Sequence, residues 1–150
     1  MTVGRICSRV MASASSRDTI RAAAQAMALH DVGTLVVLDA TDPAGQLGIV
    51  TDRDIVIRCV ARGLDPDRES IGSVCSRPVH CVDEQTPVED AIQQMAKAET
   101  RRLVVLGDSG RPVGVLSLDD ILELLADEAG AMGRLVAAQQ GSVPATIGAR

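Results

Sequence analysis

The chain has 150 residues, 46% of them hydrophobic, carries a net charge of −5 and contains no Phe, Tyr or Trp. This length is enough for one ordinary domain or for two small units that share a core. The acidic charge argues against a general nucleic-acid surface, and the missing aromatic side chains exclude the stacking platforms on which single-stranded nucleic acids are usually bound.

In the first half of the chain, the pattern predicts three short strands and two helices. A strand over 10–14 is followed by a helix over 19–30, whose residues Ile20, Ala23 and Met27 recur at helical spacing. The apolar runs 35–38 and 47–50 predict a hairpin with a turn at 42–45. A second helix is expected over 52–62, ended by Gly63.

The same order returns in the second half. After a polar segment over 65–73, the pattern predicts a strand over 79–82, a helix over 87–98, strands over 103–106 and 113–116, and a helix over 118–127. Beyond Glu128 the helical pattern decays, because Gly130 and Gly133 weaken any helix over 129–140, and 141–150 is expected to be disordered. The predicted organisation is a first repeat over 3–64, a linker over 65–73, a second repeat over 74–127, and a partly disordered tail over 128–150.

Four sequence blocks occur twice in the same order. Gly-Ile-Val-Thr-Asp-Arg-Asp at 48–54 returns as Gly-Val-Leu-Ser-Leu-Asp-Asp at 114–120, 66 positions later (48 to 114). Blocks at 6–9, 19–27 and 35–38 return 68 positions later (6 to 74). The chain is therefore a tandem repeat of β-α-β-β-α units, of the α+β class. One unit cannot cover both faces of a three-stranded sheet, so we expect the two units to pair about a pseudo-two-fold axis.

The repeated motif suggests two kinds of role for its polar residues. Thr51 is a good N-cap and Asp54 falls at the third helical position, which makes a capping-box variant. The motif could therefore do no more than start a helix. The exposed N–H groups at such a helix start can also hold a phosphate, and Asp54 could accept hydrogen bonds from a ribose.

The duplicated β-α-β-β-α order and the two motifs ending in Asp54 and Asp120 resemble the CBS-domain pair, or Bateman module, over residues 3–127. The stretch 51–66 is especially similar to small stand-alone members of that family. The resemblance implies a regulatory sensor and not an enzyme. Its ligand would be an adenine nucleotide (AMP, ADP or ATP), or a relative such as S-adenosylmethionine or NAD(H).

The resemblance also implies two ligand clefts between the paired repeats. The first cleft would use Thr51, Arg53 and Asp54, with Val79, His80 and Cys81 from the second repeat. The second cleft would use Ser117 and Asp120, with Met11, Ala12 and Ser13 from the first repeat. Between the clefts would lie Gly33 and Thr34 and the equivalent Arg101 and Arg102. These two arginines are candidates for phosphate neutralisation, because a guanidinium fork fits phosphate oxygens.

Two other functional interpretations remain open from the sequence. The chain could be a structural or interaction module whose clefts bind nothing, with 129–150 as its functional part. It could also be a zinc or redox sensor that uses its cysteines and histidines, namely Cys7, Cys59, Cys75, Cys81, His30 and His80. No Cys-x-x-Cys motif is present, and the pair His80 and Cys81 has no orienting third group for catalysis.

The partner predictions follow from the same observations. We expect a homodimer with the helices over 19–30 and 87–98 near its interface, and an unknown effector protein, but no nucleic acid and no membrane. No apolar run approaches a membrane span and the first residues lack a signal-peptide pattern, so we expect a cytoplasmic protein with reduced cysteines. An energy-sensing or stress-response role is implied by the resemblance alone.

Overall fold

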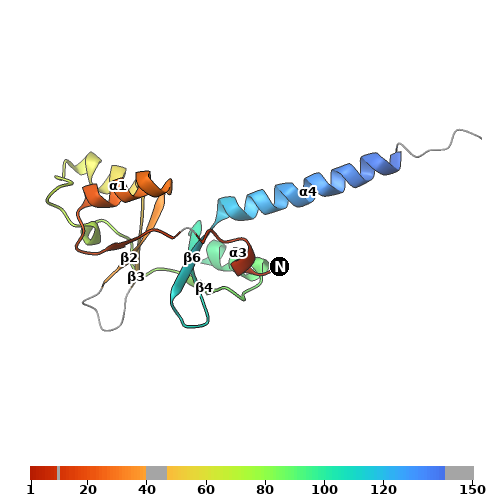
Figure 1. The fold of residues 1–150 in the computed structure, drawn as a ribbon, viewed down its shortest axis with the longest axis horizontal. Coiled ribbons are helices and arrows are strands. Elements are labelled where there is room, and N and C mark those ends of the chain that lie inside the picture. Colours follow the sequence, from red (N-terminus) through yellow and green to blue (C-terminus); the bar gives the residue numbers. More distant parts are fainter. Residues whose placement is uncertain (10, 40–46, 141–150) are drawn as a thin grey trace, which may run out of the picture.

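The computed structural model describes residues 1–9, 11–39 and 47–140 and contains two three-stranded sheets, one in each repeat (Figure 1). The first repeat contributes β1 (Ser13–Ser15), α1 (Ile20–His30), β2 (Thr34–Leu38), β3 (Leu47–Thr51) and α2 (Asp52–Arg58). The second contributes β4 (Cys81–Asp83), α3 (Val88–Lys97), β5 (Arg102–Leu106), β6 (Pro112–Ser117) and α4 (Leu118–Gln140). Short 3-10 helices are η1 (Val3–Arg5), η2 (Val60–Arg62) and η3 (Ile71–Ser73).

Both sheets have the same topology, which confirms the predicted β-α-β-β-α order. In the first sheet β1 pairs parallel with β2, and β2 pairs antiparallel with β3. In the second sheet β4, β5 and β6 pair in the same way. Leu35 lies opposite Val50 and Leu103 opposite Leu116, so both predicted hairpins form. The turn expected at 42–45 lies outside the described residues.

The central strands are buried on both faces. Leu35 and Val37 belong to a core cluster under α1, whereas Val36, fully buried between them, belongs to neither helix-side cluster. Val104 has the same position in the second sheet. Because successive strand residues point to opposite faces, each sheet has a second buried face that does not contact its own helices. This arrangement requires cover from the other repeat, as expected for a pair that folds as one unit.

The segments that precede β1 and β4 are exchanged between the two packing units. Val3 and Cys7 are buried in the core of the second repeat, and the backbone of Ser8 pairs with Val115 of β6. Reciprocally, Ile71 and Val74 belong to the core of the first repeat. The segment 71–76 therefore packs on the repeat that precedes it, and the sequence repeats and the packing units have different boundaries.

Helix boundaries differ from expectation at two places. The helix expected over 52–62 divides into α2 and η2, and the chain then turns at Gly63, whose φ of 66° is the left-handed conformation that glycine adopts without strain. Helix α4 continues for 23 residues through Gly130 and Gly133 and projects away from both sheets (Figure 1). No described helix is long and apolar enough to cross a membrane.

Candidate functional site

Each repeat places a capping box at the point where its last strand becomes a helix. The Asp54 N–H donates to Thr51 Oγ1 at 3.1 Å, and Asp54 Oδ2 accepts from the Thr51 N–H at 2.9 Å and from its hydroxyl at 3.0 Å. Ser117 and Asp120 repeat all three bonds, at 3.2, 2.7 and 2.6 Å. The cap thus fixes one carboxylate oxygen of each aspartate and leaves the other oxygen, Oδ1, for further contacts.

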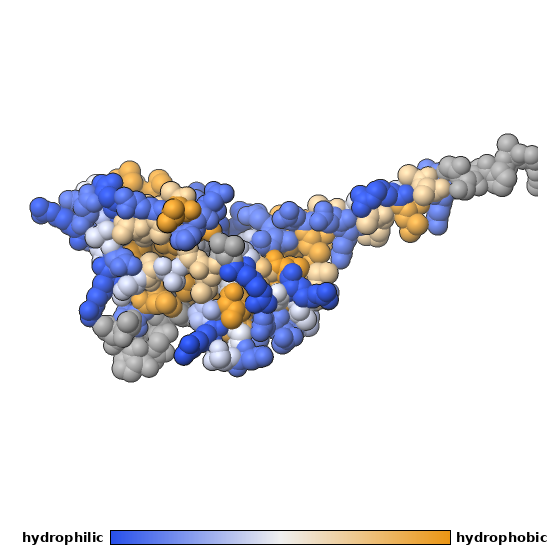
Figure 2. Space-filling view, in the orientation of Figure 1, coloured by the Kyte–Doolittle hydropathy of each residue, from blue (hydrophilic) through white to orange (hydrophobic). Residues whose placement is uncertain are grey.

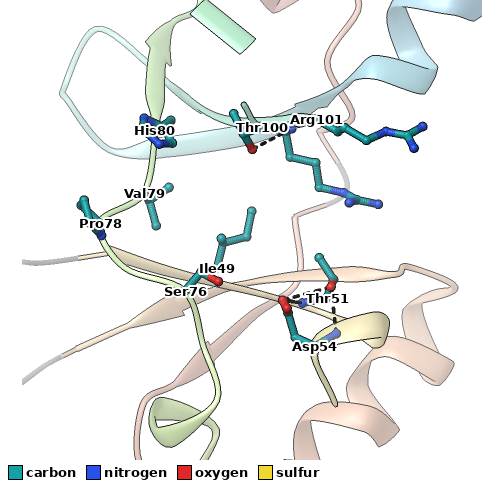
Figure 3. Close-up of a pocket in the computed structure, with 10 residues that line it drawn as sticks. Ile49, Thr51, Asp54, Ser76, Pro78, Val79, His80, Thr100 and Arg101 are labelled. Atoms are coloured by element: carbon teal, nitrogen blue, oxygen red, sulfur yellow. Dashed lines mark hydrogen bonds between the residues drawn. The ribbon is translucent and has the colours of Figure 1, made fainter. Parts of the chain in front are cut away.

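The first cavity has a volume of about 290 Å³ and lies between the two repeats (Figure 3). One side carries Thr51 and Asp54 from the first repeat, and the other carries Val79, His80 and Thr100 from the second. The full lining is Ile49, Thr51, Asp54, Ser76, Pro78, Val79, His80, Thr100, Arg101 and Arg102. Thr51 and Asp54 of the first motif therefore lie in one cavity with residues 79 and 80, as predicted.

The second cavity, of about 180 Å³, is the counterpart of the first under the internal repeat. Its lining is Ser8, Met11, Val32, Gly33, Thr34, Arg102, Val115, Ser117 and Asp120. Ser117 and Asp120 meet Met11 as expected. Gly33 and Thr34 occupy the positions that Arg101 and Arg102 occupy in the first cavity, 68 positions apart (34 to 102).

Among the residues that the structure describes, Arg102 is the one side chain that lines both of these cavities. Its guanidinium forms no ion pair or hydrogen bond within the described ranges. Arg101, by contrast, lies 3.3 Å from an Asp119 carboxylate oxygen, and both side chains are largely exposed. Such an exposed pair adds little stability. Arg102 is therefore the cation best placed to meet an anionic ligand in either cavity.

A third, outer cavity of about 390 Å³ adjoins the first and shares Thr51, Arg101 and Arg102 with it. It is lined by Thr51, Asp52, Arg53, Arg101, Arg102 and Asp119. Arg53 lines this outer cavity instead of the first one. Three arginines face two aspartates there, so its lining carries a net positive charge.

Arg58 gives Asp54 a contact that Asp120 lacks in the described structure. Its Nη2 lies 3.3 Å from Asp54 Oδ1, while its Nη1 donates to the Val74 carbonyl at 2.7 Å and to Ser76 Oγ at 3.0 Å. Arg58 thus ties Asp54 to a segment that lines the first cavity. The equivalent residue of the second repeat is Leu124, and Asp120 Oδ1 has no partner among the residues that the structure describes.

Besides Arg53, three residues predicted for the clefts line neither of the two cavities. Ala12 packs against the first core cluster, and Ser13 begins β1. Cys81 lines a separate cavity of about 320 Å³, with Gln94, Lys97, Ala98 and Leu103. His80 lines both that cavity and the first one. The strand expected over 79–82 is formed over 81–83, so residues 79 and 80 reach the cavity from the segment before the strand.

The sequence prediction also missed several lining residues. Ile49, Ser76, Pro78 and Thr100 line the first cavity, and Ser8, Val32 and Val115 line the second. Three pairs of them are related by the repeat: 49 with 115, 8 with 76, and 32 with 100. The internal repeat would have identified these pairs if one member of each had been known.

The cysteines do not assemble into a metal centre in the described part of the chain. No group of three or more His, Cys, Asp or Glu side chains lies close enough there to hold a metal ion. Burial raises the pKa of the Cys7 thiol and the pKa of the Cys81 thiol. Both thiols are therefore protonated near neutral pH, which makes them weak metal ligands and weak nucleophiles.

The CBS domain pattern matches residues 3–60 and 71–127. The chain belongs to the CBS-domain family. Hypoxic response protein 1 of Mycobacterium tuberculosis is 34% identical over 112 residues, which cover 75% of this chain and 76% of that protein. An uncharacterized protein of Methanopyrus kandleri is 32% identical over 124 residues, and the match spans 83% of this chain but only 62% of that protein's length. The predicted similarity to stand-alone CBS pairs is thus confirmed.

Solved CBS-domain structures have the same fold. A CBS domain protein of Pyrobaculum aerophilum complexed with AMP is 30% identical, with a TM-score of 0.69 over 84% of this chain and 99% of that one. The CBS domain pair of protein MJ0100, in complex with 5′-methylthioadenosine and S-adenosyl-L-methionine, is 28% identical, with a TM-score of 0.69 over 83% of this chain and 99% of that one. Hypoxic Response Protein I with two coordinated zinc ions is 31% identical, with a TM-score of 0.68 over 82% of this chain and 98% of that one.

Proposed function

We propose that this chain is a regulatory sensor that binds an adenosine-containing nucleotide in the cavities between its two CBS repeats. The observation that carries the proposal is the repeated pair of cavities. Each combines the capping-box aspartate of one repeat with the segment before the first strand of the other. A ligand in either cavity would therefore contact both repeats and change the contact between them.

The lining chemistry suits the three parts of a nucleotide. Oδ1 of Asp120 can accept hydrogen bonds from ribose hydroxyls because the cap occupies only Oδ2, and Oδ1 of Asp54 can do so with the lone pair that does not face Arg58. Ile49 and Val79 offer aliphatic surface for the adenine ring in the first cavity. A chain without Phe, Tyr or Trp has to hold the base in this way.

Phosphate groups would be neutralised by arginine. Arg102 lines both cavities, and its fork geometry matches phosphate oxygens. A ligand with further phosphates would extend from the first cavity into the adjoining outer cavity, where Arg53 and Arg101 are also present. AMP, ADP and ATP are therefore the preferred ligands, and S-adenosylmethionine or NAD(H) would use the ribose and base contacts alone or with Arg102.

Two solved relatives support this ligand class. The Pyrobaculum protein is complexed with AMP, and the MJ0100 pair is in complex with S-adenosyl-L-methionine and 5′-methylthioadenosine. All three molecules contain adenosine. Their shared part is the part that the aspartate and the aliphatic side chains would recognise.

The output of such a sensor would pass to an effector protein or to a second copy of the chain. A ligand shifts a conformational equilibrium only by its differential affinity for the two states. The expected homodimer interface near α1 and α3 remains a prediction, as does a cytoplasmic location. Among the described residues of α1 and α3, the exposed large apolar side chains are Leu29, at 81%, and Ile92, at 38%.

The experiment begins with the ultraviolet spectrum of the purified protein, followed by nucleotide chromatography of the supernatant after heat release. Because the chain has no Trp, Tyr or Phe, absorbance near 260 nm would come almost entirely from a bound ligand. If none is bound, AMP, ADP, ATP, S-adenosylmethionine and NADH are added one at a time in a melting assay followed by circular dichroism. We expect at least one to raise the melting temperature, as any ligand specific to the native state must. A flat spectrum with no shift for any of the five would contradict the proposal and favour an interaction module.

A further inference from the structure

The distal part of α4 extends away from the rest of the described structure (Figure 1). Every residue from Leu125 to Gln140 is exposed, and the helix projects away from both sheets (Figure 1). A short solvated helix in water is marginal, and Gly130 and Gly133 weaken it further. A second surface that covers this segment would therefore stabilise it.

One face of the helix carries an apolar stripe. Leu122, Leu125, Ala129, Met132 and Val136 recur at alternating spacings of three and four residues, which is the heptad pattern of a two-helix seam. The four large side chains of the stripe are each at least 50% exposed. Hydrophobic (orange) atoms are visible at the surface of the projecting helix in Figure 2. The rest of the helix surface carries Ala131, the charged residues and one further exposed large apolar side chain, Leu135, about a quarter of a turn from the stripe.

The charges along α4 indicate what can cover the stripe. Residues 118–128 carry five acidic side chains and no basic one, a net charge of −5, whereas residues 129–140 carry only Arg134, a net charge of +1. Two copies of the helix in parallel would place the two acidic halves side by side. In antiparallel pairing, each acidic half lies beside the neutral-to-basic half of the other copy, and the globular parts lie at opposite ends.

We propose that the distal half of α4 is a self-association surface, on which α4 of a second copy packs antiparallel. A register that sets Leu125 opposite Val136 of the second copy also sets Ala129 opposite Met132, because both pairs share one midpoint. The two-fold axis then passes at the level of residues 130–131, where Ala129 of each copy leaves room for Met132 of the other. The helix that begins at the second cavity, with Ser117 and Asp120, thereby continues into the interface.

The first test is sedimentation equilibrium of the full-length chain between 1 and 100 µM, with two matched variants. Met132→Glu and Ala131→Glu add the same charge at adjacent positions, but Met132 lies on the stripe and Ala131 lies off it, about 100° further around the helix. We expect wild type and Ala131→Glu to be dimeric, and Met132→Glu to raise the dimer dissociation constant at least tenfold. A monomeric wild type, or equal behaviour of the two variants, would overturn the proposal.

The orientation is tested by oxidative cross-linking. The double variant Leu125→Cys/Val136→Cys should form covalent dimers, whereas Leu125→Cys alone and wild type with its four native cysteines should not. Cross-linking by the single variant would indicate parallel helices and refute the antiparallel assignment. Neither test involves a nucleotide, so both are independent of the proposed ligand.

Discussion

Replacing Arg102 is the sharpest test of how the two cavities are built. Arg102→Gln removes the only side chain that lines both of them and has no competing ion pair within the described ranges. A hydrogen bond to a charged group contributes about 1.5–3 kcal/mol, and each 1.4 kcal/mol corresponds to a factor of ten in affinity. We therefore expect AMP to bind roughly ten- to a hundredfold more weakly.

The assay is isothermal titration of the variant with AMP and, in parallel, with adenosine. Because adenosine lacks the phosphate, its affinity should stay within about a factor of two to three, the usual context dependence of such contacts. Arg111→Gln is the matched control, since Arg111 is exposed and lines none of the three cavities described above. An equal loss for AMP and adenosine would show that Arg102 supports the fold instead of the phosphate, and would refute the reasoning.

Three further predictions concern stability, measured by denaturation followed by circular dichroism. Arg58→Leu, which copies Leu124 of the second repeat, should lower the free energy of unfolding by about 1–3 kcal/mol because it leaves the part-buried Val74 carbonyl unpaired; an unchanged value would contradict this role. Gly114→Ala should cost about 1–3 kcal/mol, because the new Cβ would lie 2.6 Å from a backbone oxygen, whereas Gly133→Ala, in open space, should not destabilise. Burial raises the pKa of the Cys7 thiol above its ordinary value of 9.0. Above about pH 9 the native state therefore retains a proton that the unfolded chain loses, so the free energy of unfolding should fall as the pH rises. Cys7→Ala should reduce that fall, and an equal fall in both proteins would show that other groups cause it.

The sequence predicted the repeat topology well because the strong signals are local. The apolar runs at 35–38 and 103–106 and the capping motifs at 51–54 and 117–120 are short patterns whose physical meaning does not depend on distant residues. Asp54 of the first motif and the segment at 79–80 meet across the first cavity as expected. This meeting could be predicted only through the family resemblance, since the contacts link residues far apart in the chain.

The features that sequence reasoning missed depend on tertiary packing. The exchange of segments 3–8 and 71–76 between the units follows from backbone pairing of Ser8 with Val115 and of Ser76 with Ile49, which has no local signal. The sharing of Arg102 depends on how closely the two repeats approach each other. The length of α4 was underestimated because propensity alone penalises Gly130 and Gly133.

The most direct test of the central claim is calorimetric titration of AMP into the nucleotide-free chain and two variants. Asp54→Ala/Asp120→Ala removes the aspartate from both cavities, and Asp90→Ala removes an exposed aspartate at the same position of α3, outside the cavities. We expect saturable binding to wild type and to Asp90→Ala, and none to a double variant that circular dichroism shows to be folded. Unchanged AMP binding by the folded double variant would contradict the assignment of the nucleotide to these cavities.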